Sequence, residues 1–335
     1  MKTEIVYSKE YLRHDNKGHP ENAERLRTMI KDFKKSKLSQ EIKIVEPEML
    51  SEDILIKVHS QRMIDQIKEI NFTGKSWIDL DTYVCMDDYD IARLAAGGVL
   101  SAAEKVLDSE IDNSFVLTRP PGHHATSERS MGFCLFNNAA ITAHYLSNKN
   151  KKILIFDPDV HHGNGTQQIF YNDKKVMYQS IHLSPHYPGT GDIEEIGIGD
   201  GKGYTINAQF SYGMGDIAAK ETLKQVFLPI AEQFKPDLII FSTGYDSHHS
   251  DPLGGLRFTA NIFGEMIKYY QRIQPKIVCT LEGGYNLNWI GKCLLSQLGQ
   301  MNDKKIIIND KIDEKTGYET VISDIKKEIR KYWKI

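Results

Sequence analysis

The sequence predicts a single α/β domain built on a mainly parallel sheet with helices on both faces. Short apolar or β-branched runs alternate with helical patterns along the whole chain of 335 residues. Because these runs are almost continuously apolar, the strands should be buried on both faces, as in a parallel sheet covered by helices. No internal repeat and no Pro/Ser-rich linker divides the chain. We therefore expect one domain over residues 1–335.

Each expected element follows from its local pattern. The strands are the near-continuous apolar runs Glu4–Tyr7, Ser114–Leu117, Ile153–Phe156, Val176–Ile181, Leu238–Phe241 and Ile277–Thr280. The helices are the segments Asn22–Lys35, Tyr89–Leu107, Asn137–Ser147, Thr166–Tyr171, Ile217–Phe234 and Phe258–Arg272. The first helix follows Pro20, and proline is common where helices start. The sequence becomes charged after about residue 301, and the lysine-rich stretch Ile322–Lys334 predicts a C-terminal helix packed on the outside.

Charge and composition exclude several classes of protein. The chain has 42 Lys and Arg against 45 Asp and Glu, a net charge of −3. Without a basic block, nucleic acid is not expected as the main partner. No apolar run is long enough for a membrane span, and the N-terminus does not read as a signal peptide. The four cysteines form no CxxC pair and predict reduced, buried thiols. We expect a cytoplasmic protein.

Chemically active side chains collect directly after five of the expected strands. Ligands of open parallel sheets bind outside the carboxyl ends of the strands, so these segments are the informative ones. They read RPPGHH (119–124), DPDVHHGN (157–164), HLSPHYPGTGD (182–192), STGYDSHHSD (242–251) and LEGGY (281–285). Most of the twelve histidines lie in them. This clustering is the main evidence from the residues alone for a catalytic site.

A metal site is predicted at the end of the third strand. Alternate residues at a strand end project to the same side, so Asp157, Asp159 and His161 share a face. Asp159 and His161 would bind one metal ion, with Asp246 from another strand end as the third ligand. Two carboxylates and one imidazole leave an open position for water, as a catalytic Zn²⁺ requires. Taken alone, the pattern also fits a phosphate or Mg²⁺ site, or polar residues that cap loops.

Two further motifs supply groups for proton transfer. His123 and His124 follow Pro-Pro-Gly, and in such a turn one ring can move a proton while the other stabilises charge. Gly283 and Gly284 present Tyr285 on a tight turn, where its phenol can donate to a developing oxyanion. The alternative for Tyr285 is a ring that simply packs at a turn.

As an ordered set, the motifs resemble those of the zinc-dependent histone deacetylase superfamily, in its class II-like and acetylpolyamine amidohydrolase branch. The motifs are RPPGHH (119–124), GFCLFNN (132–138), DPDVHHGNGTQ (157–167), PGTGD (188–192), GYD (244–246) with DPLGG (251–255), and LEGGY (281–285). The resemblance runs from about His19 to Tyr285. It implies the arginase/deacetylase fold, one domain with an eight-stranded, mainly parallel sheet.

The resemblance also implies residue roles. Asp159, His161 and Asp246 match the zinc ligands, His124 the general base and acid, and Tyr285 the phenol that polarises the scissile carbonyl. The other matches are His123 as electrostatic partner, Asp157 and Asn164 behind the two histidines, Gly132, Phe133 and Tyr187 along the acyl-lysine tunnel, Asp81 at its rim, Arg25 in an acetate channel, and Asp157, Asp159, His161, Ser180 and Ile181 around a structural K⁺. Many members have Asp at the position of Asn164, and Phe is usual at that of Tyr187.

These matches predict a deacetylase that releases acetate from acetyl-lysine side chains or acetylated polyamines. Both substrates present the same methylene chain and amide, and the sequence does not separate them. A binuclear manganese ureohydrolase of the arginase type is one alternative, although this chain offers few carboxylates for a second metal ion. A non-catalytic acyl-lysine binding module is the other. The sequence leaves a homo-oligomer open.

Overall fold

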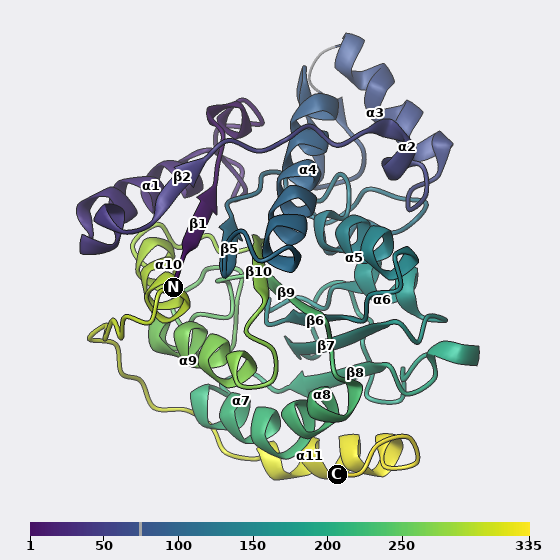
Figure 1. Cartoon of the computed structure of the whole chain (residues 1–335), viewed down its shortest axis with the longest axis vertical. Helices are drawn as coiled ribbons and strands as arrows, with labels where there is room; N and C mark the ends of the chain where they lie inside the picture. Colours follow the sequence, from purple (N-terminus) through teal and green to yellow (C-terminus); the bar gives the residue numbers. More distant parts are fainter. Residues whose placement is uncertain (74–75) are drawn as a thin grey trace.

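The computed structural model describes residues 1–73 and 76–335, which form one α/β domain around an eight-stranded sheet (Figure 1). The strand order is β2-β1-β5-β10-β9-β6-β7-β8, and every neighbouring pair is parallel. The strands are β1 (Thr3–Val6), β2 (Lys43–Val45), β5 (Asn113–Val116), β6 (Ile153–Asp157), β7 (Val176–Leu183), β8 (Thr205–Phe210), β9 (Leu238–Thr243) and β10 (Ile277–Leu281). A short antiparallel pair, β3 (Ser76–Trp77) and β4 (Tyr83–Val84), lies apart from the sheet. The sequence prediction of a mainly parallel sheet is confirmed.

Helices cover both faces of the sheet and create two hydrophobic cores. One core joins the sheet to α1 (Glu24–Lys35), α7 (Asp216–Thr222), α8 (Leu228–Phe234), α9 (Ala260–Gln271), α10 (Ile290–Met301) and α11 (Tyr318–Ile329). The other joins it to α2 (Glu52–Leu55), α3 (Gln61–Thr73), α4 (Asp88–Leu107), α5 (Asn138–Asn148) and α6 (Asn164–Phe170). Successive residues of one strand face opposite cores, for example Leu154 and Ile155 of β6. The near-continuous apolar strands follow from this double burial.

The structure adds elements that the sequence pattern did not reveal. All six expected strands are present, but the two edge strands β2 and β8 were missed. Strand β2 is short and largely exposed, and β8 contains polar residues, so neither reads as an apolar run. Helices α2, α3 and α10 were also not expected. The expected helix Ile217–Phe234 is interrupted by a π-helical segment over Leu223–Phe227, which ends two residues before Pro229, a residue with no N–H to donate.

The chain after α10 differs from the rest of the domain. Residues 302–317 run in irregular conformation along the outside, and α11 then packs against β8 and α7 (Figure 1). The C-terminal helix spans Tyr318–Ile329, so the expected range Ile322–Lys334 was placed several residues too late. Among the described residues, no helix combines the length and the apolar character that a membrane crossing would require.

The fold explains why the five polar segments lie together. They follow β5, β10, β9, β6 and β7, which are consecutive neighbours in the centre of the sheet. Since all these strands are parallel, their carboxyl ends open on the same edge. Residues that are far apart in sequence therefore meet at one place.

Candidate active site

Asp159, His161 and Asp246 form a compact group at the carboxyl edge of the sheet. Nδ1 of His161 lies 3.0 Å from Oδ1 of Asp159 and 3.3 Å from Oδ2 of Asp246. Both carboxylates are fully buried, and one ligand atom from each of the three residues lies within 4.8 Å of the others. The structure therefore brings together the three residues predicted as metal ligands.

The surrounding backbone fixes the two carboxylates. Oδ2 of Asp159 accepts the N–H of Gly283 at 2.9 Å, and Oδ1 of Asp246 accepts the N–H of Val160 at 3.0 Å. Oδ2 of Asp246, in contrast, is buried and receives no hydrogen bond from the described residues. A buried carboxylate oxygen without a donor is costly unless a cation or a proton satisfies it. Two carboxylates and an imidazole nitrogen fit one divalent metal ion such as Zn²⁺.

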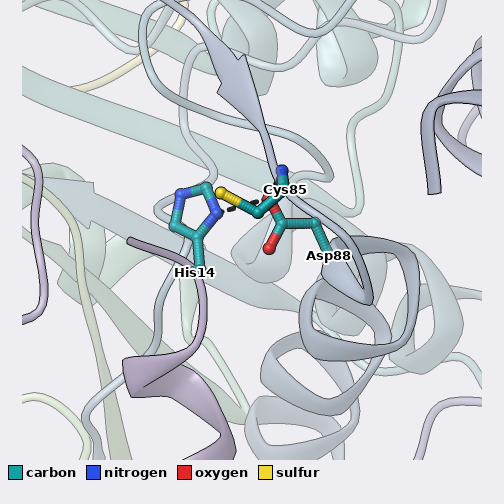
Figure 2. Close-up of side chains that lie close together, drawn as sticks. All are labelled: His14, Cys85 and Asp88. Carbon is teal, nitrogen blue, oxygen red and sulfur yellow. Dashed lines mark hydrogen bonds and ion pairs between the residues drawn. The ribbon is translucent and has the colours of Figure 1, made fainter. Parts of the chain in front are cut away.

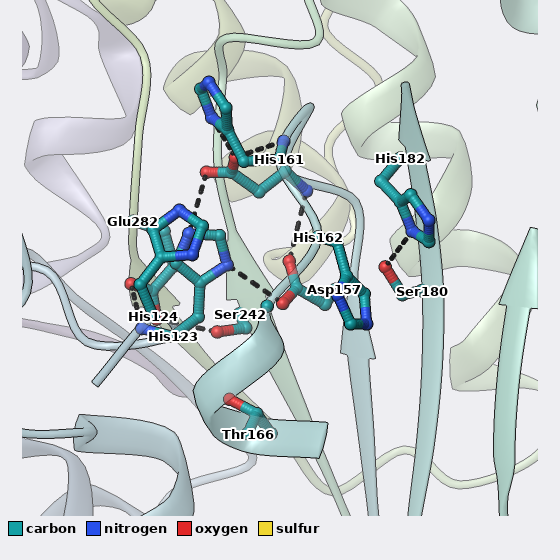
Figure 3. A network of polar contacts seen from close by, with 12 residues as sticks. His123, His124, Asp157, His161, His162, Thr166, Ser180, His182, Ser242 and Glu282 are labelled. Atoms are coloured by element: carbon teal, nitrogen blue, oxygen red, sulfur yellow. Dashed lines mark hydrogen bonds and ion pairs between the residues drawn. The ribbon is translucent and has the colours of Figure 1, made fainter. Parts of the chain in front are cut away.

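His123 lies against the floor of this group and is held by Asp157 (Figure 3). Its Nδ1 is 3.1 Å from Oδ2 of Asp157, which also accepts the hydroxyl of Tyr178 at 3.0 Å. Burial disfavours the charged ring, but the carboxylates of Asp157 and Asp159 outweigh this and raise the pKa of His123 to about 10. In the absence of a bound metal ion, this pKa makes His123 a cation at neutral pH.

His124 has a different environment. Its Nδ1 lies 2.8 Å from the amide oxygen of Asn164. Burial, followed by the neighbouring rings of His123 and His161, lowers the pKa of His124 well below its usual value. A neutral His124 donates Nδ1–H to Asn164, so that its Nε2 carries the lone pair. The histidine pair thus combines a cation with a neutral base.

Glu282 holds the turn that carries the two histidines and was not singled out by the sequence analysis. Its Oε2 accepts the backbone N–H of Gly122 at 2.7 Å and that of His123 at 3.1 Å, and Ser242 donates to its Oε1 at 2.6 Å (Figure 3). The only sequence signal was its place in LEGGY (281–285), directly before the two glycines. This buried carboxylate fixes the turn that presents the histidines.

Tyr285 reaches the same cavity from the β10 side. Its backbone N–H donates to Oδ2 of Asp251 at 2.6 Å, and its ring meets that of Phe133 edge-on at 5.9 Å between centroids. Burial, and then the charge of Asp246, raises the pKa of Tyr285 well above its usual value, so the phenol keeps its proton. Tyr285 can therefore donate a hydrogen bond into the cavity.

The cavity measures about 370 Å³ and has aromatic walls and a polar floor. Its lining includes His123, His124 and His161 on the floor, Tyr285 at the side, and Gly132, Phe133, Tyr187, Leu253 and Asp81 toward the mouth. Both Gly132 and Phe133 have positive φ, a tight turn that directs the Phe133 ring. All four residues predicted for the tunnel and its rim thus line this cavity. His186, which the sequence analysis did not assign, also lines it and stacks on His161 at 4.9 Å.

Known proteins are similar to this chain in sequence and in fold. A model of the histone deacetylase domain matches residues 19–301. A probable deacetylase of Archaeoglobus fulgidus is 36% identical over 100% of this chain and 99% of its own length. Histone deacetylase 5 of Arabidopsis thaliana is 35% identical over 99% of this chain and 54% of its own length. The crystal structure of the HDA15 HD domain superposes with a TM-score of 0.93 at 31% identity and covers 99% of this chain and 97% of that one.

The chain belongs to the histone deacetylase family. The expected family and its fold, with eight strands and helices on both faces, are confirmed. Family membership also argues against the arginase-type alternative. A deacetylase of this family acts as a hydrolase on acetylated substrates.

In this deacetylase, Arg25 supports the tyrosine turn. Its guanidinium donates to the carbonyl oxygens of Gly284 at 2.7 Å and Glu282 at 2.5 Å, and to Oε1 of Glu21 at 3.0 Å. Its Cζ lies 5.0 Å from the centroid of the Tyr285 ring. The Arg25 side chain is fully buried and already has protein partners, so its role in an acetate channel stays a prediction.

The residues predicted around a monovalent cation lie on adjacent strands of the deacetylase. Asp157 of β6 pairs in register with Ser180 of β7, and Ile181 follows it. The hydroxyl of Ser180 lies 2.9 Å from Nδ1 of His182 (Figure 3). This juxtaposition is compatible with a cation held by backbone carbonyls, and the site stays a prediction.

A second group of close polar side chains lies between β4 and α4. Oδ2 of Asp88 lies 2.6 Å from Nδ1 of His14 and accepts the N–H of Cys85 at 2.5 Å (Figure 2). Burial opposes a charge on His14, yet the Asp88 carboxylate outweighs it and raises its pKa. An ion pair between histidine and aspartate therefore accounts for this group, which anchors the chain between β4 and α4.

Proposed function

We propose that this deacetylase is a zinc-dependent amidohydrolase that removes acetyl groups from N-acetylated primary amines. One observation carries the proposal: His161, which forms a compact group with Asp159 and Asp246, lines the same cavity as His123, His124 and Tyr285. A module that only binds acyl-lysine has no need for this complete set. Zn²⁺ held by these residues would supply Lewis acidity to the acetyl carbonyl and lower the pKa of a bound water.

The side chains then divide the proton transfers. The lone pair on Nε2 of His124 removes a proton from water as that water attacks the acetyl carbonyl carbon. The Tyr285 hydroxyl donates a hydrogen bond to the oxygen that becomes negative, while His123, held by Asp157, stabilises the charge nearby. The amide C–N bond then breaks. Nε2 of His124 returns its proton to the leaving amine, and acetate and the free amine are released.

The walls of the cavity point to a slender, unbranched substrate. Phe133 and Tyr187 present aromatic faces that suit the methylene chain of an acetyl-lysine or an acetylpolyamine. Asp81 at the mouth adds a carboxylate whose pKa is raised by burial and then by Asp79. Such a carboxylate can accept a peptide N–H or a second ammonium group, so both substrate classes belong to the proposal. A structural potassium ion is proposed at Asp157, Asp159, His161, Ser180 and Ile181. The cytoplasm is proposed as the compartment of the protein, in agreement with its four free thiols.

Turnover measurements test the proposal. The wild-type protein, loaded with Zn²⁺, is assayed on acetyl-lysine peptides, acetylputrescine and acetylspermidine, with and without a chelator. We expect release of acetate that the chelator abolishes and that Zn²⁺ restores. The substrate with the highest kcat/KM identifies the class. Full activity in the presence of chelator would refute a metal-dependent mechanism.

A metal analysis provides an independent test with a matched control. His161 and His162 are neighbours, but the His162 ring faces away from the group and bonds Thr190 at 2.8 Å and Gln167 at 3.0 Å. We expect the His161→Ala variant to lose stoichiometric zinc and the His162→Ala variant to retain one equivalent. One full equivalent in His161→Ala would contradict the ligand assignment.

A further inference from the structure

Residues 302–317, called the strap below, lie beyond the part of the chain that matches the histone deacetylase domain. Several contacts attach the strap to the domain. Asn261 at the start of α9 exchanges hydrogen bonds with the backbone of Ile308 at 2.9 and 3.0 Å. Glu314 accepts the N–H of Ile217 at the start of α7 at 2.9 Å. Between these points, the side chain of Asp310 turns inward and is buried.

Asp310 accepts hydrogen bonds from three N–H groups of the body of the domain. Its Oδ2 lies 3.0 Å from Nε2 of His248 and 2.7 Å from the backbone N of Ala260, and its Oδ1 lies 2.9 Å from Nε2 of His249. Hydrogen bonds to a buried carboxylate are among the stronger ones in proteins. The strap is therefore attached to the loop that follows β9.

Two histidines and a carboxylate also form a common metal-ligand set, and these three are close enough to hold an ion. The ring of His248 argues against it. Its Nδ1 accepts the backbone N–H of Ser250 at 3.2 Å, so the proton of the neutral ring is on Nε2. That nitrogen donates to Asp310 and offers no lone pair to a metal ion. A structural attachment explains the group better.

The attached loop, residues 247–251, joins the metal group to the catalytic tyrosine. It starts directly after Asp246 and ends at Asp251, whose Oδ2 accepts the N–H groups of Tyr285 at 2.6 Å and Asn286 at 3.0 Å. Asn286 also donates to the carbonyl oxygen of Ser250 at 2.5 Å. A shift of this loop would move a metal ligand and the phenol relative to each other.

We propose that the strap is a positioning element of the active site, in which Asp310 fixes the 247–251 loop and through it the spacing between Asp246 and Tyr285. The inference rests on the proposed function, since it concerns the same catalytic groups. Asp310 touches neither substrate nor metal, and acts through His248 and His249. Docking of the strap and turnover are therefore coupled.

The Asp310→Asn variant tests the inference, because asparagine keeps the shape but replaces one acceptor oxygen by a donor. We expect kcat to fall about tenfold, as for other residues that orient a metal site indirectly, with KM little changed. Zinc release to a chelator should accelerate, and trypsin should cleave faster after the exposed Lys305 and Lys311 of the strap. The matched control is Asp313→Asn, an exposed strap residue whose side chain has no hydrogen bond or ion pair to any described residue. It should behave like the wild type.

A second variant protects the test against misfolding. His249→Ala removes one of the three donors at a partly exposed ring and should give smaller changes in the same direction. Faster trypsin cleavage of Asp310→Asn with unchanged kcat and unchanged zinc release would overturn the inference, and so would an equal loss in Asp313→Asn. If the wild type hydrolyses no acetylated amine, the proposed function fails, whereas zinc release and cleavage still report on the strap.

Discussion

Nδ1 of His124 lies 2.8 Å from an amide oxygen, that of Asn164, where many members of the family place a carboxylate. The amide accepts the Nδ1 proton without adding a negative charge beside the ring. His124 is therefore oriented as a base with its lone pair on Nε2, while its charged form gains little support. The charge in this part of the site is instead placed on His123 by Asp157.

This relationship makes Asn164 a residue that orients the base. In the Asn164→Ala variant, Nδ1–H of His124 loses its acceptor and the ring is free to rotate or change tautomer. We expect kcat to fall about tenfold or more, with zinc content unchanged. Asn164→Asp restores an acceptor oxygen and should recover most of the activity. Steady-state kinetics of both variants checks this, and an Asn164→Ala enzyme with wild-type kcat would exclude the orienting role.

Tyr285→Phe removes a single donor from the cavity while its ring still packs against Phe133. Because the hydroxyl is expected to stabilise the oxyanion, kcat should fall about 100-fold or more. Zinc content should stay at one equivalent, since Tyr285 is not a ligand. Turnover assays and metal analysis of the same sample check both statements. Wild-type rates in this variant would remove Tyr285 from the mechanism.

Gly283 is required because the metal group leaves no room for a side chain. A Cβ at this position would lie 1.9 Å from Oδ2 of Asp246. We expect Gly283→Ala to displace that carboxylate and to lose zinc and activity. Gly18→Ala is the control, because a Cβ there meets open space and only its positive φ adds strain, about 1–2 kcal/mol. Elemental analysis measures the zinc content, and circular dichroism checks that zinc loss is not caused by unfolding. One full equivalent of zinc in Gly283→Ala would contradict this packing.

His59 predicts how the stability of the fold depends on pH. Its Nδ1–H donates to the carbonyl oxygen of Thr126 and its Nε2 accepts the N–H of Asn137, both at 2.9 Å, so the folded site holds the neutral ring. Burial lowers the pKa of His59 to about 4 from 6.5. Between these values the unfolded state binds the proton and the folded state does not. The contribution of the neutral His59 to the free energy of unfolding is therefore fully present above pH 6.5 and is lost as pH falls toward 4.

Urea unfolding at pH 7 and pH 5 measures this effect. The free energy of unfolding should decrease by about 2 kcal/mol through His59 alone over that interval. Because other groups titrate too, the same measurement is made on the His59→Gln variant. This variant should be less stable than the wild type at pH 7, but its free energy of unfolding should decrease by about 2 kcal/mol less between pH 7 and pH 5. Equal losses in both proteins would show that His59 does not stay neutral in the folded state.

The chemistry of the site was predictable because it lies at strand ends. The five motif segments follow strands that are apolar on both faces, and parallel strands bring their carboxyl ends to one edge. Asp159, His161 and Asp246 could therefore be assigned to one metal site, and His123, His124 and Tyr285 placed beside it, before their distances were known. Edge strands β2 and β8 were not predictable, because an exposed or half-polar strand lacks the apolar run that marks a buried one.

The sequence by itself determined the family, the central strands and the reactive side chains, because each depends on residue type and short spacing. Only the tertiary structure decided what supports them: Glu282 beneath the histidine turn, Arg25 behind the tyrosine turn, and Asp310 of the strap on the 247–251 loop. These contacts join residues tens to hundreds of positions apart. No local sequence pattern encodes such a pair. The partner of a buried charge depends on which donors remain near it after the packed elements have excluded water.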